Sequence, residues 1–146
     1  MKIQSLGHVV LKVRNLERSE RFYTGLLGMP VSARYDENGM RMTFFTLGNH
    51  HDLALMEVPG TEAAGGDQAV GLHHVAFCIG ESIDQLREAK AHLEAADIAL
   101  MPVDHDVTQS LYFDDPDGNT LELYVDMSEG WRSEPHRIAT VKPLEL

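Results

Sequence analysis

One strand-like sequence occurs twice in this chain, and that duplication limits the folds open to it. Leu6–Val13 reads LGHVVLKV, and Leu72–Ile79 reads LHHVAFCI. Both stretches are rich in β-branched and aromatic residues, which favours strands. A histidine stands at the same point of the alternation in each copy, His8 and His74. A supersecondary unit that recurs along a chain predicts two copies of one module.

Length and composition are those of a globular protein. With 146 residues and 43% apolar content, the chain is expected to form a single domain over 1–146. Its formal charge of −11 argues against nucleic acid and anionic membranes as partners. No apolar run approaches the roughly 20 residues of a membrane span, and we expect no signal peptide. A single cysteine, Cys78, excludes an intrachain disulfide and fits a reducing cytoplasm.

Turn and capping residues divide the chain into two modules of the same kind. The first module, about 3–58, is expected to run strand, helix and three strands, at 3–13, about 16–27, 30–35, 40–47 and 52–58. After a glycine-rich linker, 59–70, the second module, about 71–126, is expected to repeat that order, at 72–79, about 83–96, 99–104, 108–113 and 120–126. The predicted fold class is therefore α+β, with two βαβββ modules in one chain.

The C-terminal tail, 127–146, has no clear period. It follows directly after the strand 120–126, and it contains Trp131. Two interpretations stay open. In one, the tail is a lid in which Trp131 closes the mouth of a cleft; in the other, it is a frayed or dimer-contacting end.

Period-two alternation sorts the two histidines onto one side of the predicted sheet. Apolar Val9, Leu11 and Val13 share the face expected under the helix, so His8 lies on the opposite face. The same alternation places His74 on the face away from the second helix. If the sheet curves, this face lines a cleft that suits a metal. The alternative is that both are ordinary half-buried or edge histidines.

A carboxylate near the end of the second module offers a third ligand. Glu122 alternates with apolar Leu121 and Leu123, so it faces the opposite side. A solvated strand glutamate is the ordinary alternative. Two imidazoles and one carboxylate would leave open metal positions, an arrangement that suits Fe(II) binding substrate and O₂; Mn(II) is chemically close.

The doubled pattern over about 3–126 resembles the vicinal oxygen chelate superfamily, which includes glyoxalase I, fosfomycin- and bleomycin-resistance proteins and extradiol ring-cleaving dioxygenases. Val103-Asp104-His105, then five residues, then Leu111 through Glu122 is similar to the signature of type I extradiol dioxygenases. A weaker match joins His51-Asp52-Leu53-Ala54-Leu55 to Leu72 through Phe77.

The resemblance implies a fold, a site and a reaction. The fold would be a curved mixed sheet around a metal-binding cleft, with His8, His74 and Glu122 as ligands of Fe(II), or of Mn(II). His51 would be the acid–base histidine. His105 would stand behind the ligands, and Tyr112 would contact the substrate, an aromatic diol cleaved with O₂. A homo-oligomer is expected. Many family members carry two such domains, whereas this chain has one.

Two other classes of function stay open. One is another metal-dependent enzyme, a glyoxalase-type isomerase or a thiol transferase, which would want an inward carboxylate on the strand 52–58, where Glu57 is the candidate. The other is a metal-free protein that binds a small aromatic drug. Taken singly, His51 would be a strand-start histidine beside His50, and His105 a surface residue.

Overall fold

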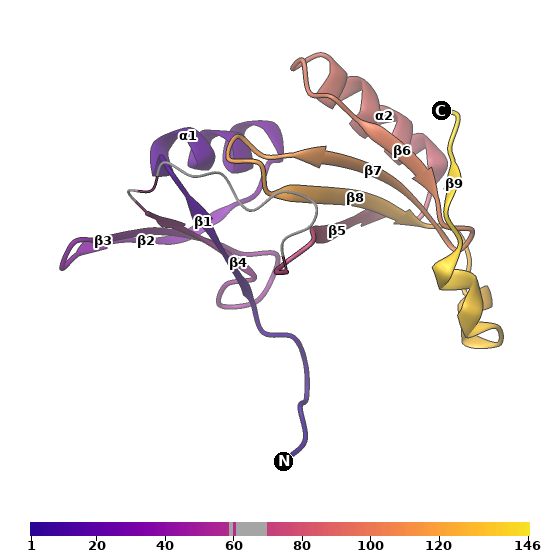
Figure 1. The fold of residues 1–146 in the computed structure, drawn as a ribbon, viewed down its shortest axis with the longest axis horizontal. Coiled ribbons are helices and arrows are strands. Elements are labelled where there is room, and N and C mark those ends of the chain that lie inside the picture. Colours follow the sequence, from indigo (N-terminus) through magenta and orange to yellow (C-terminus); the bar gives the residue numbers. More distant parts are fainter. Residues whose placement is uncertain (59, 61–69) are drawn as a thin grey trace. The chain divides into compact units, whose positions relative to one another are not determined.

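A computed structural model describes residues 1–58, 60 and 70–146. The chain divides into two compact units, Met1–Asp67 and Gln68–Leu146, and each is described here by itself (Figure 1). The border falls inside the predicted linker 59–70, most of which lies outside the described residues. The organisation of both units as one domain stays a prediction.

The first unit is a mixed four-stranded sheet with one helical segment. Its elements are β1 (Val9–Val13), α1 (Leu16–Arg21), the π-helical turn η1 (Phe22–Leu26), β2 (Val31–Glu37), β3 (Met40–Phe45) and β4 (Leu53–Glu57). The strands are ordered β1-β4-β3-β2. β1 pairs in parallel with β4, and the other neighbours are antiparallel.

The second unit repeats this plan and adds a strand. Its elements are β5 (Val75–Gly80), α2 (Ile83–Glu94), β6 (Met101–Asp104), β7 (Thr108–Asp114), β8 (Thr120–Asp126), the short helices η2 (Gly130–Arg132) and η3 (Pro135–Ala139), and β9 (Lys142–Pro143). The order is β5-β8-β7-β6-β9, with β5 parallel to β8. The shared strand order confirms two βαβββ modules with mixed sheets, an α+β fold.

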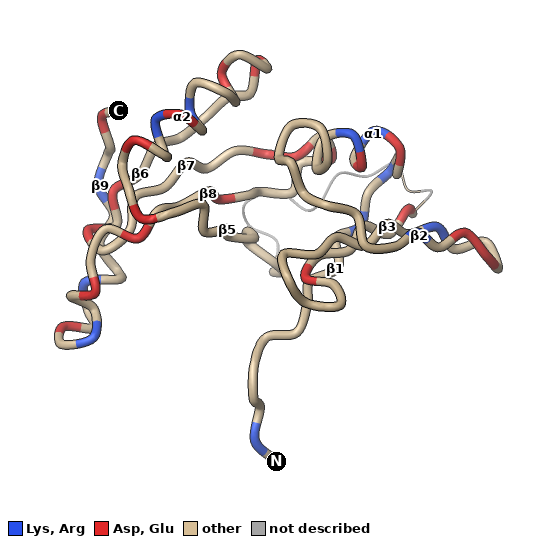
Figure 2. The backbone as a smooth tube through the Cα atoms, turned by 180° about the vertical axis from the view of Figure 1, so that it is seen from behind, with Lys and Arg blue, Asp and Glu red and all other residues tan. Residues whose placement is uncertain are grey.

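Local sequence signals explain where the helices begin. Asn15 caps α1, since its side chain accepts from the backbone N–H of Arg18 at 2.8 Å. Ser82 and Gln85 form the capping box that starts α2. Figure 2 shows acidic and basic positions interspersed along both helices, as expected for their solvated sides. No helix among the described residues is long and apolar enough to cross a membrane.

The alternation predicted for the repeated strands holds. In β1, Leu11 and Val13 are buried, while Val10 and Lys12 are exposed. In the second unit, Leu86 of α2 packs in a core with Leu111 of β7 and Val125 of β8. The apolar face of each module is thus the buried one, and the opposite face is left for polar side chains.

Several boundaries differ from the sequence prediction, and three of the differences concern the repeated strands and the first helix. The first strand begins at Val9 rather than residue 3, because its parallel partner β4 begins at Leu53, which is paired with Val9. β5 likewise begins at Val75 rather than 72. His8 and His74 therefore lie immediately before their strands. The helix expected at 16–27 changes at Phe22 into a π-helical turn, in which Leu27 N–H donates to the Phe22 carbonyl at 3.2 Å.

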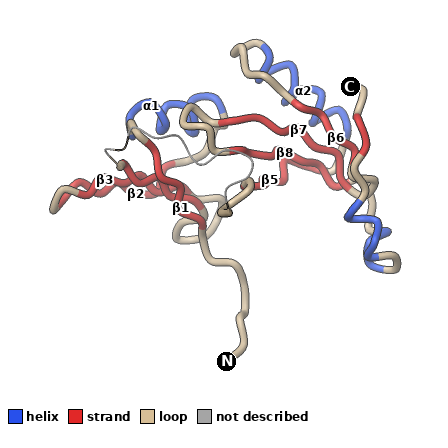
Figure 3. The backbone as a smooth tube through the Cα atoms, viewed as in Figure 1, coloured by secondary structure: helices blue, strands red, loops and turns tan. Residues whose placement is uncertain are grey.

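The C-terminal segment, residues 127–146, is ordered rather than frayed. It forms η2 and η3 and ends in β9, which pairs antiparallel with β6 at the sheet edge (Figure 3). Lys142 is paired with Asp104, and Pro143 with Val103. The segment thus belongs to the fold of the second unit.

Candidate active site

Glu122 is a buried carboxylate on β8, an interior strand of the second unit's sheet. Its residue is 7% exposed, and in register it lies between Ala76 of β5 and Tyr112 of β7. One carboxylate oxygen, Oε2, lies 3.0 Å from Nε2 of His74. The other, Oε1, accepts a hydrogen bond from the Ser110 hydroxyl at 2.5 Å. The solvated alternative for Glu122 is therefore wrong.

His74 and Glu122 have the geometry of two ligands for one cation. A buried carboxylate is costly unless it is paired, and here an imidazole supplies the partner. Bonds of about 2.1 Å at a right angle would place two donor atoms about 3 Å apart, close to the observed spacing. The other ring nitrogen of His74, Nδ1, lies 2.7 Å from Nδ1 of His73, which helps to orient the ring.

His105 and Tyr112 form a hydrogen-bonded pair beside this carboxylate. Nε2 of His105 lies 3.0 Å from the Tyr112 hydroxyl, and Nδ1 lies 2.7 Å from the backbone carbonyl of Thr140. Because a carbonyl only accepts, Nδ1 must carry the hydrogen. In the neutral ring, Nε2 therefore accepts from Tyr112. The alternative that His105 is an isolated surface residue is wrong.

Burial and the neighbouring Glu122 together raise the pKa of the Tyr112 hydroxyl well above its ordinary value of 10.0. Burial is the larger cause, and the hydrogen bond and negative charge of Glu122 follow. The phenol thus keeps its proton at neutral pH. Tyr112 is a hydrogen-bond donor in this site rather than a phenolate.

Three histidines of the first unit lie together. The ring nitrogens of His8, His50 and His51 can be chosen so that all lie within 4.8 Å of one another. The rings of His8 and His51 are 4.1 Å apart between centroids. The resemblance implied roles for His8 and His51, and His50 was expected only as a neighbour of His51. The only signal for His50 was its position beside His51.

The environment of His51 favours its neutral form. Burial, followed by the nearby His8 and His50, holds the pKa of His51 below its ordinary value of 6.5. A neutral imidazole has one nitrogen free to accept a proton or to bind a metal. The cluster therefore offers both functions, and the assignment of His8 as ligand and His51 as base stays a prediction.

Glu57 is engaged in a structural role. Its carboxylate accepts from the backbone N–H of Leu16 at 2.9 Å and from Arg41 Nη1 at 2.7 Å. Leu16 is the first residue of α1, so the carboxylate also satisfies a free N–H at the helix start. Both oxygens are occupied, which argues against the extra ligand that the isomerase alternative required.

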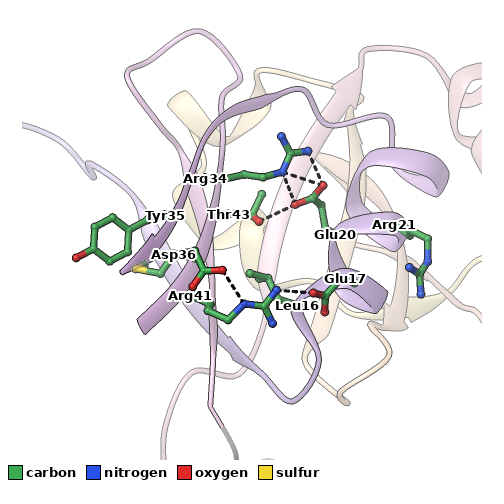
Figure 4. A pocket seen from close by; sticks show the side chains of 10 residues that line it. Leu16, Glu17, Glu20, Arg21, Arg34, Tyr35, Asp36, Arg41 and Thr43 are labelled. Carbon is green, nitrogen blue, oxygen red and sulfur yellow. Dashed lines mark hydrogen bonds and ion pairs between the residues drawn. The ribbon is translucent and has the colours of Figure 1, made fainter. Parts of the chain in front are cut away.

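A charged pocket of about 310 Å³ lies between α1 and the β2–β3 hairpin (Figure 4). Arg34 forms a two-pronged ion pair with Glu20, which also accepts from Thr43. Arg41 pairs with Glu17, as well as with Glu57. Arg34 and Arg41 are thus both paired with carboxylates. We interpret the pocket as an ion-pair network that holds α1 against its sheet.

A second cavity, of about 290 Å³, lies in the second unit and includes Glu122. Its lining also contains Ala76 and Tyr124, and from the C-terminal segment Trp131 and Ile138. The candidate ligand Glu122 thus borders a space large enough for a small molecule.

Comparison with known families decides the broader identity. The model of the Glyoxalase/Bleomycin resistance protein/Dioxygenase superfamily matches residues 5–123. The chain belongs to this superfamily. The fold agrees: a solved glyoxylase/bleomycin resistance protein/dioxygenase domain from Frankia sp. EAN1pec has a TM-score of 0.72 and 26% identity, covering 86% of this chain and 99% of that one.

Curated members of the superfamily similar to this chain have different activities. One is biphenyl-2,3-diol 1,2-dioxygenase 3 of Rhodococcus globerulus, 36% identical over 83% of this chain and 63% of that enzyme. Another is the glutathione transferase FosA of Serratia marcescens, 30% identical over 84% of this chain and 82% of that protein. The chain thus spans less than two thirds of the dioxygenase. Superfamily members are metal-dependent enzymes, but they do not share one metal or one reaction.

Proposed function

We propose that this protein is a non-haem Fe(II)-dependent extradiol dioxygenase that cleaves a catechol-like aromatic diol with O₂. The observation that carries the proposal is the buried Glu122 beside His74, at 3.0 Å, with the His105–Tyr112 pair next to it. The similarity to a biphenyl-diol dioxygenase supports the same reaction class. Mn(II) is the alternative metal.

His8, His74 and Glu122 are the proposed metal ligands. Imidazole nitrogen and carboxylate oxygen form the donor set that suits an iron centre with open positions. When bound, Fe(II) would hold the diol and O₂ together and let ring electrons reach oxygen without nicotinamide or flavin. The contribution of His8 from the other unit rests on the sequence repeat and on the resemblance.

The remaining residues would handle protons and orientation. His51 would accept a proton from a diol hydroxyl, and its neutral ring has a nitrogen free to do so. Tyr112 keeps its single hydrogen and, when the diol binds, would turn it from Nε2 of His105 to a substrate oxygen. His105, held at Nδ1 by the Thr140 carbonyl, would set the direction of the Tyr112 hydroxyl.

Location and assembly belong to the same proposal. The single cysteine fits a reducing compartment, and we propose the cytoplasm. A homo-oligomer is part of the same proposal. Light scattering of the purified protein at several concentrations measures the assembly.

A thiol transferase or glyoxalase-type isomerase is the second candidate. The glutathione transferase FosA supports it, because this chain spans 82% of that protein. The engagement of Glu57 by Leu16 and Arg41 weighs against a fourth ligand from β4. A metal-free drug-binding protein is the third candidate. The buried Glu122–His74 pair weighs against it, because binding an aromatic drug does not need metal ligands.

The test is anaerobic loading with Fe(II), followed by exposure to catechols in air. A dioxygenase should consume one O₂ per diol and give a coloured ring-opened product. His92→Ala, an exposed position on α2, is the matched control and should react like the unaltered protein. Thiol addition or isomerisation by the metal-loaded protein, without O₂ uptake, would contradict the proposal.

A further inference from the structure

We infer that the C-terminal segment builds an apolar subsite beside Glu122, and that Trp131 and Ile138 there bind an apolar substituent of the diol. The inference rests on the proposed function. It names the substrate class as catechols that carry a compact aryl or alkyl group and no charge on that group.

The cavity of about 290 Å³ is lined by both polar and apolar residues. Glu122, Thr108 and Asp126 supply its polar groups. Val107, Trp131 and Ile138 supply an apolar wall. A molecule held by its hydroxyls near Glu122 would therefore present the rest of its ring to apolar side chains. The volume is at the small end for ligand sites, which favours a compact substituent.

The apolar wall has surface to offer a ligand. Trp131 is 41% exposed and Ile138 is 60% exposed, although both are large apolar residues. Contact with an apolar group would remove that surface from water, which is favourable in proportion to its area. Val107, in contrast, is already buried.

The wall is held in place by contacts on both sides of Ile138. Arg137 makes a two-pronged ion pair with Asp106, from Nε at 2.6 Å and from Nη2 at 2.8 Å. The Thr140 carbonyl accepts from His105 at 2.7 Å. On the other short helix, Arg132 lies over the Trp131 ring at 4.7 Å and pairs with Glu129. A wall fixed before binding loses little entropy when the ligand arrives.

Charge in the cavity disfavours an anionic substituent. Glu122 and Asp126 line it, and none of the described lining residues is a lysine or arginine. A carboxylate on the ring would lie near these acidic groups without a cation of the lining to pair with it. The subsite should therefore prefer a neutral apolar group over a carboxylate.

The test compares three diols: 3-phenylcatechol, catechol and 3,4-dihydroxybenzoate. The unaltered Fe(II)-loaded protein should show its highest kcat/KM with 3-phenylcatechol and its lowest with the carboxylate. Trp131→Ala and Ile138→Ala should each reduce the preference for 3-phenylcatechol over catechol by about 10-fold or more. Val141→Ala is the matched control: Val141 is exposed in the same segment and outside the cavity lining. It should keep the full preference.

Binding without turnover provides an independent readout. Trp131 is the single tryptophan, so anaerobic 3-phenylcatechol should quench its emission, and Ile138→Ala should weaken that binding. If diols are cleaved but both variants keep the preference, the subsite is wrong and the dioxygenase stands. If no diol is cleaved but Ile138-dependent quenching remains, the proposed function is wrong and the subsite stands. Equal quenching in Ile138→Ala and the unaltered protein overturns the inference.

Discussion

At the scale of single residues, the candidate site is built around the buried carboxylate of Glu122. The carboxylate is buried, and its two oxygens face different partners, His74 and Ser110. Across the strand pair lies Tyr112, which holds its proton because of burial and Glu122. A cation would replace the imidazole–carboxylate contact without unpairing the carboxylate.

His74→Ala should remove most of the bound metal, because it deletes one of the proposed ligands. The measurement is metal analysis after anaerobic Fe(II) loading and gel filtration, with His92→Ala as the control. Full occupancy in His74→Ala would exclude His74 as a ligand. If His50→Ala loses the metal instead, the cation is bound by the three-histidine cluster of the first unit.

His51→Ala should keep its metal but lose turnover by about 10²–10⁴-fold, the range for removal of a general acid or base. The proposed role for His51 is proton transfer, not ligation, so occupancy and turnover should separate. Steady-state rates are compared with metal content for this variant and for His50→Ala. Unchanged turnover would make His51 a structural residue.

At the scale of elements, specific polar contacts start helix α2 and hold the C-terminal segment. The Ser82–Gln85 capping box starts α2, whose Leu86 and Leu93 are fully buried. The Asp106–Arg137 ion pair and β9 fasten the C-terminal segment to the sheet of the second unit. The capping box satisfies backbone N–H groups at the start of a helix that buries Leu86 and Leu93. The ion pair and β9 hold the C-terminal segment against its sheet.

Ser82→Ala should lower the free energy of unfolding by about 1 kcal/mol, because the backbone N–H of Gln85 at the start of α2 loses its side-chain acceptor. Urea denaturation followed by circular dichroism measures the change. Ser32→Ala, at an exposed position on β2, should stay within about 0.5 kcal/mol of the unaltered protein. Equal stability of Ser82→Ala and Ser32→Ala would contradict a stabilising role for the cap.

Acid should release the C-terminal segment. The hydrogen bond from Arg137 holds the pKa of Asp106 below its ordinary 3.8. A lowered folded-state pKa stabilises the paired form at pH above 3.8, and that contribution is lost as pH falls through the lowered value. Trp131 emission, recorded from neutral pH downward, should change there. At pH 7, Asp106→Asn should already show the Trp131 emission that the unaltered protein shows only at low pH. If this variant titrates like the unaltered protein, Asp106 does not hold the segment.

At the scale of the whole molecule, the chain consists of two copies of one plan. Each copy has a parallel pair formed by its first and fourth strands and an apolar face covered by its helix. The proposed ligand set takes His8 from the first copy, and His74 and Glu122 from the second. Metal binding should therefore depend on both units and should stabilise both of them against unfolding.

Saturating Mn(II) should raise Tm by about 5–10 °C, as expected for a ligand at about 100 times its Kd and a chain of this size. His8→Ala should lose most of this increase, and Lys12→Ala, on the same exposed side of β1, should keep it. Scanning calorimetry with and without metal measures both. If Mn(II) raises the Tm of His8→Ala as much as that of the unaltered protein, His8 is not a ligand.

The sequence by itself determined the features that depend on neighbours in the chain. The period-two pattern of Leu11 and Val13 predicted the buried face of β1, and Ser82 with Gln85 predicted the start of α2. The repeat predicted the two modules, and strand alternation placed Glu122 on the face opposite Leu121 and Leu123. Strand alternation and helix capping act over a few residues, so local sequence is sufficient for them.

Tertiary structure decided the partners that are distant in sequence. It placed the Thr140 carbonyl against His105, joined Arg137 to Asp106 and gave Glu57 to Leu16 and Arg41. It also made the first strand begin late, at Val9, because the register with β4 begins at Leu53. Hydrogen bonds and ion pairs satisfy whichever buried group the fold brings close. Their choice therefore follows from packing in three dimensions, which no local pattern of residues contains.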